Sequence, residues 1–194
     1  MRSKTKIKKL IKNCKKQEWS AQKELYLLFA DDMMSIAIRY SKDLSSAKDL
    51  VQETFLTFFK KIDQYDENKG ALGALLSKIL INNSFVEYRK NQRIIFTGEE
   101  VFLDQFSNET SVIETLEAED ILNLLQKLPH GCRIIFNLKV IEGYSHNEIG
   151  ELLEITPSAS RSQLTRAKKL LRDMINKSSS IEKRINPNYK SKRV

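Results

Sequence analysis

The chain has 194 residues, 41% of them hydrophobic and 30% charged, with only three prolines and six glycines. This length suits one medium domain or two small ones, and the abundance of Leu, Ile, Lys and Glu favours helix almost throughout. No stretch approaches the roughly 20 consecutive apolar residues that cross a membrane, and no alternating strand pattern is present. We therefore expect an all-α, cytoplasmic protein without membrane insertion.

The positive charge of the chain is unevenly distributed. The sequence has 33 basic and 25 acidic residues, a formal net charge of +8. Between Arg93 and Lys127 there is no Lys or Arg, but there are eight acids: Glu99, Glu100, Asp104, Glu109, Glu114, Glu117, Glu119 and Asp120. Outside this segment 33 basic residues stand against 17 acidic ones. Such segregation suits a polyanionic partner.

Side chains that would support catalysis or hold a metal are scattered. Cys14 and Cys132 are far apart in the sequence, and neither His130 nor His146 stands near a convincing cluster of cysteines or carboxylates. No GxxxxGKS/T or GxGxxG phosphate-binding motif is present, and no serine has a credible base. We therefore expect two reduced thiols, no metal, no cofactor and no enzymatic activity.

The first part of the chain is expected to be a small helical domain behind a basic extension. The extension is residues 1–18, and the domain is residues 19–93, where three amphipathic helices can close a core. Their apolar stripes are Leu25, Leu28, Phe29, Ile36 and Tyr40, then Val51, Phe55, Phe58 and Ile62, and then Leu72, Leu75, Leu76, Ile79 and Val86. Ser45 and Ser46 are expected to cap the second helix.

An acidic segment separates this domain from a second one. Residues 94–116 hold no period and are expected to form a flexible linker. Residues 117–176 are expected to form four short helices, the last two of them a helix-turn-helix. The tail, residues 177–194, is rich in serine and basic residues, so we expect it to be disordered.

Residues 143–172 carry the signals of that helix-turn-helix. Gly143 would end the preceding helix, and Ser145 and Glu148 have the spacing of a capping box. Thr156 and Pro157 then begin the second helix. One side of this helix is apolar, whereas the other offers hydroxyl and basic side chains where a DNA-reading helix would place them. Scaffolding of a core is the alternative interpretation.

Two faces of the first domain also suit binding. Asp49, Gln52 and Glu53 share one helix face, which suits a basic protein partner, although a merely solvent-exposed helix is the alternative. The third helix carries amides, an aromatic ring and basic side chains, namely Lys78, Asn82, Asn83, Tyr88, Arg89, Lys90 and Arg93. This mixture suits single-stranded DNA; a solvated helix with a positive C-terminal end is the alternative.

Four stretches together resemble the bacterial sigma factors, and more narrowly the two-domain extracytoplasmic-function group. They are AKDLVQETF at 47–55, LLSKILIN at 75–82, IFNLKVIEGYSHNEIG at 135–150 and SRSQLTRAK at 160–168. The resemblance implies a sigma factor that binds core RNA polymerase, directs it to specific promoters and promotes strand opening.

The resemblance also implies three functional surfaces. Contact with the clamp helices of the largest polymerase subunit is implied for Asp49, Gln52, Glu53 and Leu56. Contact with the non-template strand of the −10 promoter element is implied for Lys78, Asn82, Asn83, Arg89 and Arg93. Contact with the −35 element is implied for Ser160, Arg161, Ser162, Gln163, Thr165, Arg166 and Lys168.

Three further expectations follow from the resemblance. The acidic linker would thread the RNA-exit path of the polymerase, and an anti-sigma protein would be an additional partner. Glu154 stands at the turn position where glycine is common in the family, and a positive φ there would cost about 1 kcal/mol. A stand-alone helix-turn-helix transcriptional regulator is the alternative function, although it would leave the first domain without a task. A nucleic-acid-processing enzyme would need a metal or nucleophile cluster, and none is visible.

Overall fold

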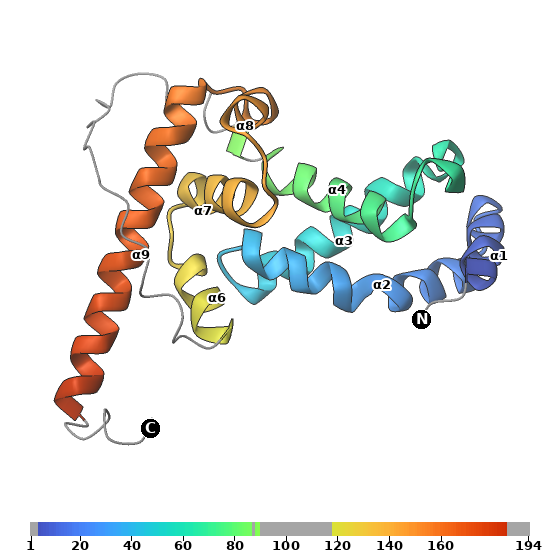
Figure 1. Ribbon diagram of the computed structural model, residues 1–194. Coiled ribbons are helices and arrows are strands. Elements are labelled where there is room, and N and C mark those ends of the chain that lie inside the picture. Colours follow the sequence, from blue (N-terminus) through green and yellow to red (C-terminus); the bar gives the residue numbers. More distant parts are fainter. Residues whose placement is uncertain (1–3, 87, 90–117, 186–194) are drawn as a thin grey trace. The chain divides into compact units, whose positions relative to one another are not determined.

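The computed structural model describes residues 4–86, 88–89 and 118–185, which contain helices and no strand. The all-α prediction is therefore confirmed for this part of the chain. The chain separates into two compact units, Met1–Arg93 and Ile94–Val194 (Figure 1). The linker expected at 94–116 lies outside the described residues.

The first unit is built on three long helices that pack against one another. Their bounds, with those of the preceding helix, are α1 Lys4–Lys15, α2 Trp19–Tyr40, α3 Leu44–Lys60 and α4 Leu72–Ser84. Helices α2, α3 and α4 contact each other pairwise. Leu25, Phe58 and Leu76 are among the side chains buried between them, so the three predicted apolar stripes close one core, except that Val86 at the end of the third stripe is exposed. Two short 3-10 turns, η1 Ile62–Gln64 and η2 Glu67–Lys69, connect α3 to α4.

Residues 4–15 of the basic extension expected at 1–18 form helix α1, which is a packed part of this unit. Helix α1 contacts both α2 and η1. Its apolar side chains Leu10, Ile11 and Cys14 are buried, and one such stripe is enough to dock an amphipathic helix. Because lysines surround these three residues, the overall composition of the segment did not indicate an amphipathic helix.

The N-cap of helix α3 lies two to three residues earlier than its serines suggest. The N-cap residue is Asp43, whose carboxylate accepts a hydrogen bond of 2.8 Å from the backbone N–H of Ser46. The predicted cap at Ser45 and Ser46 is therefore wrong. Aspartate caps at least as well as serine, and here it stands at the position where the backbone is extended.

The second unit packs three short helices along one long helix (Figure 1). The bounds are α6 Ala118–Gln126, α7 His130–Phe136, the π-helical turn η4 Asn137–Ile141, α8 His146–Leu153 and α9 Pro157–Ile185. Leu125, Leu128, Cys132 and Ala167 form a buried cluster, against which Leu170 and Leu171 pack. Gly143 ends the η4 segment with a φ of +82°, as its position predicted.

Helix α9 has 29 residues, so it is neither short nor confined to the expected second domain. It continues to Ile185, into the segment from residue 177 that was expected to be disordered. Each residue added to an existing helix gains one hydrogen bond, and serine opposes helix only weakly. The serine-rich composition was therefore a poor guide to where the helix ends.

Candidate nucleic-acid interface

The two helix starts of the helix-turn-helix are formed as the sequence predicts. The backbone N–H of Glu148 donates to Ser145 Oγ at 3.2 Å, and that of Ser145 donates to Glu148 Oε2 at 2.7 Å. The hydrogen bonds from Ser145 lower the pKa of the Glu148 carboxyl. At the second start, the Ala159 N–H donates to Thr156 Oγ1 at 3.1 Å. Both helices are therefore firmly capped.

The turn between α8 and α9 depends on Glu154, whose conformation was expected, and on Gly150, whose role was not predicted from the sequence. Glu154 has φ 59° and ψ 41°, the predicted left-handed conformation. The chain then folds back so closely that the Ile155 N–H donates to the Gly150 carbonyl at 3.0 Å. A Cβ at Gly150 would lie 2.8 Å from the Ile155 carbonyl oxygen. Glycine at 150 therefore permits the tight approach.

We expect Gly150→Ala to destabilise the second unit by about 1–3 kcal/mol, because the backbone must shift to admit the methyl group. Gly73→Ala in α4 is the matched control: its Cβ would make an ordinary contact of 3.5 Å with Phe29. This control should stabilise the first unit by about 0.5–1 kcal/mol through higher helix propensity. Urea unfolding followed by circular dichroism measures both changes. Equal effects of the two substitutions would show that the turn tolerates a side chain.

The start of α9 presents most of the predicted −35-contacting residues to solvent. Arg161, Thr165, Arg166 and Lys168 are exposed, and Ser162 is half-buried. The Thr165 hydroxyl donates to the Arg161 carbonyl at 3.1 Å, which orients its methyl group and its remaining acceptor capacity. The face opposite the Ala167 cluster is thus basic and hydroxyl-bearing, as DNA reading requires.

Two predicted −35-contacting residues turn inward. Ser160 is fully buried, and its hydroxyl lies 2.9 Å from His146 Nδ1. Gln163 is half-buried, and its Oε1 accepts a hydrogen bond from Cys132 Sγ at 3.1 Å. Because it is buried, Ser160 does not belong to the predicted DNA-reading surface. Gln163 is engaged in a hydrogen bond with Cys132 inside the unit. Helical periodicity places both beside the core, which a list of polar residues does not show.

His146 links the two helices of the motif through Ser160. Partial burial lowers the pKa of the imidazole, and the nearby cations Lys139, Arg161 and Lys168 lower it further. The ring is therefore neutral at physiological pH and shares one hydrogen bond with the hydroxyl. From the sequence, His146 was considered only as a candidate catalytic or metal-binding residue, whereas in the structure its ring joins α8 to α9 through Ser160.

On α3, the predicted polymerase-contacting residues lie together on one solvent-exposed face. Asp49, Gln52 and Glu53 are exposed, and the Leu56 side chain is 52% exposed. The Thr57 hydroxyl donates to Glu53 Oε1 at 3.5 Å. The face therefore combines carboxylate, amide and apolar groups, all open to solvent.

The first unit also has a surface pocket of about 430 Å³, lined by predicted and unpredicted residues. The lining residues are Thr57, Phe58, Lys61, Gln64, Tyr65, Leu75, Ile79, Asn82, Asn83, Val86 and Arg89. The Asn83 amide donates to Thr57 Oγ1 at 3.4 Å, and the Arg89 guanidinium lies 5.1 Å from the centre of the Phe85 ring. Amide, aromatic and cationic groups thus surround a space of ligand size.

The structure places the predicted −10-contacting residues unequally around this pocket. Asn82, Asn83 and Arg89 line it, whereas Lys78 is exposed on α4 and is not among its lining residues. Arg93 lies outside the described residues. Lys61, Gln64 and Tyr65 were missed because they belong to the connection after α3, and only the folded chain brings them beside α4.

Among the described residues, no group of three or more His, Cys, Asp or Glu side chains is arranged to hold a metal ion. None of the helices over the same ranges is long and apolar enough to span a membrane. A basic helix-turn-helix and an amide-lined pocket are the features that the described residues do present, and both are typical of a DNA-binding protein.

Comparison with known proteins identifies the family. Models of "Sigma-70 region 2" and "Sigma-70, region 4" match residues 25–94 and 118–171. The ECF RNA polymerase sigma factor SigW of Bacillus subtilis is 26% identical over 181 residues, which cover 87% of this chain and 96% of the relative. SigM of the same organism is 25% identical over 157 residues, which cover 79% and 94%.

One solved structure that this chain is similar to is the sigma factor RpoE from Bartonella quintana, in complex with the anti-sigma factor NepR. It has a TM-score of 0.48 and 24% sequence identity, and the match covers 79% of this chain and 96% of that one. The two family matches and the relatives show that the chain belongs to the extracytoplasmic-function group of RNA polymerase sigma factors. Its function is to direct RNA polymerase to promoters for transcription initiation.

Proposed function

We propose that three surfaces divide the work of initiation. The α3 face binds the clamp helices of core polymerase, the pocket of the first unit accepts an unpaired base of the −10 element, and the start of α9 reads the −35 element. The observation that carries this proposal is the pocket, because it gathers Asn82, Asn83 and Arg89 into a space suited to a nucleobase. A stand-alone regulator would have no use for such a pocket.

The composition of the α3 face supports a protein partner. Asp49 and Glu53 offer negative charge on an otherwise basic protein, which favours a basic surface. Leu56 supplies the apolar contact that excludes water at the centre of an interface. Gln52 adds a polar contact at the same exposed face.

The pocket supports recognition of single-stranded DNA. The Asn82 and Asn83 amides provide donors and acceptors for a base edge, and the Tyr65 ring provides a surface for stacking. Lys61 and Arg89 stand at the pocket as phosphate partners. Lys78 extends the same cationic surface along α4, and we include Arg93 on the resemblance alone.

For the −35 element, Arg161, Ser162, Thr165 and Arg166 are proposed to reach base edges, and Lys168 to contact phosphate. The exposed basic side chains of α9 support this assignment. Ser160 and Gln163 are left out because their polar atoms are engaged within the unit. They position the reading helix instead.

Two finer elements of the proposal rest on membership of the group. The acidic linker is proposed to occupy the RNA-exit path, although its residues 94–116 lie outside the described part of the chain. An anti-sigma protein is proposed as a further partner, because such inhibitors are frequent in this group. Such a partner would keep the sigma factor inactive while the two proteins are bound to each other.

Reconstituted transcription tests the proposal as a whole. Purified protein added to core polymerase should yield transcripts that start at defined promoters, and mapped starts should share two upstream elements. Core polymerase alone provides the background. Binding to DNA without any association with core polymerase would overturn the proposal and favour a stand-alone regulator.

Asn82→Ala is expected to weaken capture of the unpaired base by about 1–3 kcal/mol, the contribution of one good base contact. The measurement is binding of the polymerase complex to a single-stranded −10 oligonucleotide in which each position is made abasic in turn. At the captured position, the abasic and Asn82→Ala effects should not add. If they add at every position, Asn82 does not contact that base.

A further inference from the structure

We propose that α1 positions the α3–α4 loop, defined as residues 61–71, and thereby sets the shape of the pocket. This inference rests on the proposed role of the pocket and adds a fourth component to it. Helix α1 lies outside the region-2 family match, which begins at residue 25. It would act through the loop, without touching the base itself.

The α3–α4 loop is mostly open to solvent, so its position depends on local hydrogen bonds, such as that from the Tyr65 hydroxyl to the Gly70 carbonyl at 3.4 Å, and on contacts from outside the loop. Apart from Ile62, which is buried, and the half-buried Tyr65 and Asp66, its residues are exposed. Asp66 holds the loop locally by accepting hydrogen bonds from the backbone and side-chain nitrogens of Asn68, at 2.9 and 3.0 Å. On the side of the core, the Tyr65 ring meets Phe58 edge-on, with centroids 6.1 Å apart.

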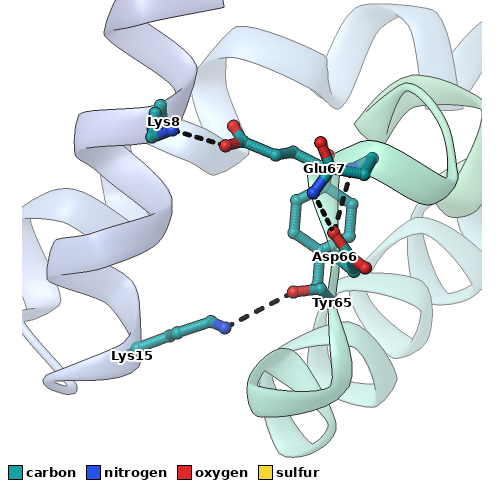
Figure 2. Close-up of polar contacts among 6 residues, drawn as sticks. Lys8, Lys15, Tyr65, Asp66 and Glu67 are labelled. Carbon is teal, nitrogen blue, oxygen red and sulfur yellow. Dashed lines mark hydrogen bonds and ion pairs between the residues drawn. The ribbon is translucent and has the colours of Figure 1, made fainter.

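Helix α1 supplies two polar contacts from the other side (Figure 2). Lys15 Nζ donates to the backbone carbonyls of Asp63 and Tyr65, both at 3.4 Å. Lys8 Nζ forms an ion pair of 2.5 Å with Glu67 Oε1. The two lysines are two turns apart on one face of α1, so they hold the loop at two points.

These two points flank two of the three loop residues that line the pocket, Gln64 and Tyr65, whereas the third, Lys61, precedes them. Gln64 and Tyr65 lie between the carbonyl of Asp63 and the side chain of Glu67, and both line the pocket. Lys15 therefore fixes the backbone from which the Tyr65 ring projects. Lys8 also pairs with the Glu67 carboxylate. This pairing neutralises the negative charge of Glu67, which would otherwise repel the DNA strand proposed to bind at the pocket.

The anchoring of α1 does not involve Lys8 or Lys15: it consists of apolar contacts and of the ion pair between Lys6 and Glu24 of α2, at 2.7 Å. Leu10, Ile11 and Cys14 are buried under it, so replacing Lys8 or Lys15 should leave the helix docked. Polar contacts at the surface contribute little to folding, and their effect is thus expected in the position of the loop. This separation makes the two lysines suitable for mutation.

Direct contact of the α1 lysines with DNA phosphates is the competing explanation. Lys12 serves as the matched control, because it lies on the same face between Lys8 and Lys15 and is exposed. A phosphate track would use all three lysines alike. Positioning of the loop would involve Lys8 and Lys15 through their partners in the loop.

The test uses the full chain bound to core polymerase and compares two single-stranded −10 oligonucleotides, one intact and one abasic at the captured position. Lys8→Glu with Lys15→Met should lower the intact-to-abasic affinity ratio by about threefold to tenfold, as expected for losing an exposed ion pair and hydrogen bonds. Adding Glu67→Lys should restore part of the ratio. Lys12→Glu should leave the ratio unchanged.

Hydrogen exchange of the backbone N–H groups at 61–71 in the free protein provides a second measurement. Exchange should become faster in Lys8→Glu with Lys15→Met and stay at the wild-type rate in Lys12→Glu. Unchanged exchange, or an equal loss of affinity for both oligonucleotides, would overturn the inference. If the wild-type complex itself does not distinguish the oligonucleotides, the pocket assignment fails, and exchange still decides whether α1 holds the loop.

Discussion

Reversing two charges on α3, by Asp49→Lys together with Glu53→Lys, is expected to reduce binding to core RNA polymerase by more than about tenfold and to abolish promoter-specific transcription. Both carboxylates are exposed on the face that carries Leu56. Like charges would then meet across the interface, and the few residues that dominate an interface each contribute about 2 kcal/mol or more.

Pull-down with core polymerase and a promoter transcription assay measure this effect. Because the two residues are exposed, the thermal unfolding of the variant should match that of the wild type. Glu151→Lys, a reversal at an exposed position of α8, is the matched control and should bind core polymerase normally. Normal core binding by the α3 variant would place the polymerase contact elsewhere.

Arg161→Ala is the second large expected effect, a loss of about 1–3 kcal/mol in binding the cognate −35 element. The guanidinium is exposed in the first turns of α9, where a reading helix reaches base edges. The loss should be concentrated on the cognate sequence, because a bidentate contact to a base distinguishes that base from others.

Competition binding with cognate and scrambled duplexes at fixed salt measures the difference. Arg172→Ala is the control, since Arg172 is also exposed on α9 but lies about three turns further along the helix. An equal loss on both duplexes, with a smaller salt slope, would instead make Arg161 a phosphate contact.

The sequence predicted those parts of the fold whose cause is local. The capping box at Ser145 and Glu148 and the start at Thr156 each depend on a few neighbouring residues, whereas the left-handed turn at Glu154 was expected from the family resemblance. Each of these features appears in the structure as predicted. Apolar periodicity likewise sufficed for the helices that form the two cores.

The features that could not be predicted from the sequence depend on contacts between segments that are distant in the chain. Ser160 is polar, but its place beside His146 follows from the crossing of two helices. The lysine-rich residues 4–15 were predicted to be part of a basic extension. In the structure they form a helix that packs on α2 and buries Leu10, Ile11 and Cys14. Lys61, Gln64 and Tyr65 join the pocket through the same kind of long-range proximity.

Each unit contains one buried free cysteine, Cys14 in the first and Cys132 in the second. The reactivity of each thiol can therefore be used to detect local unfolding of its unit. Burial raises the pKa of the Cys14 thiol to about 11 and also raises that of Cys132, so neither sulfur reacts readily while it is covered. A thiol reagent would therefore modify Cys14 only in molecules in which α1 has detached, and Cys132 only in molecules in which the second unit has opened. Mass spectrometry of the two peptides would follow these motions separately in one native sample, without an introduced label.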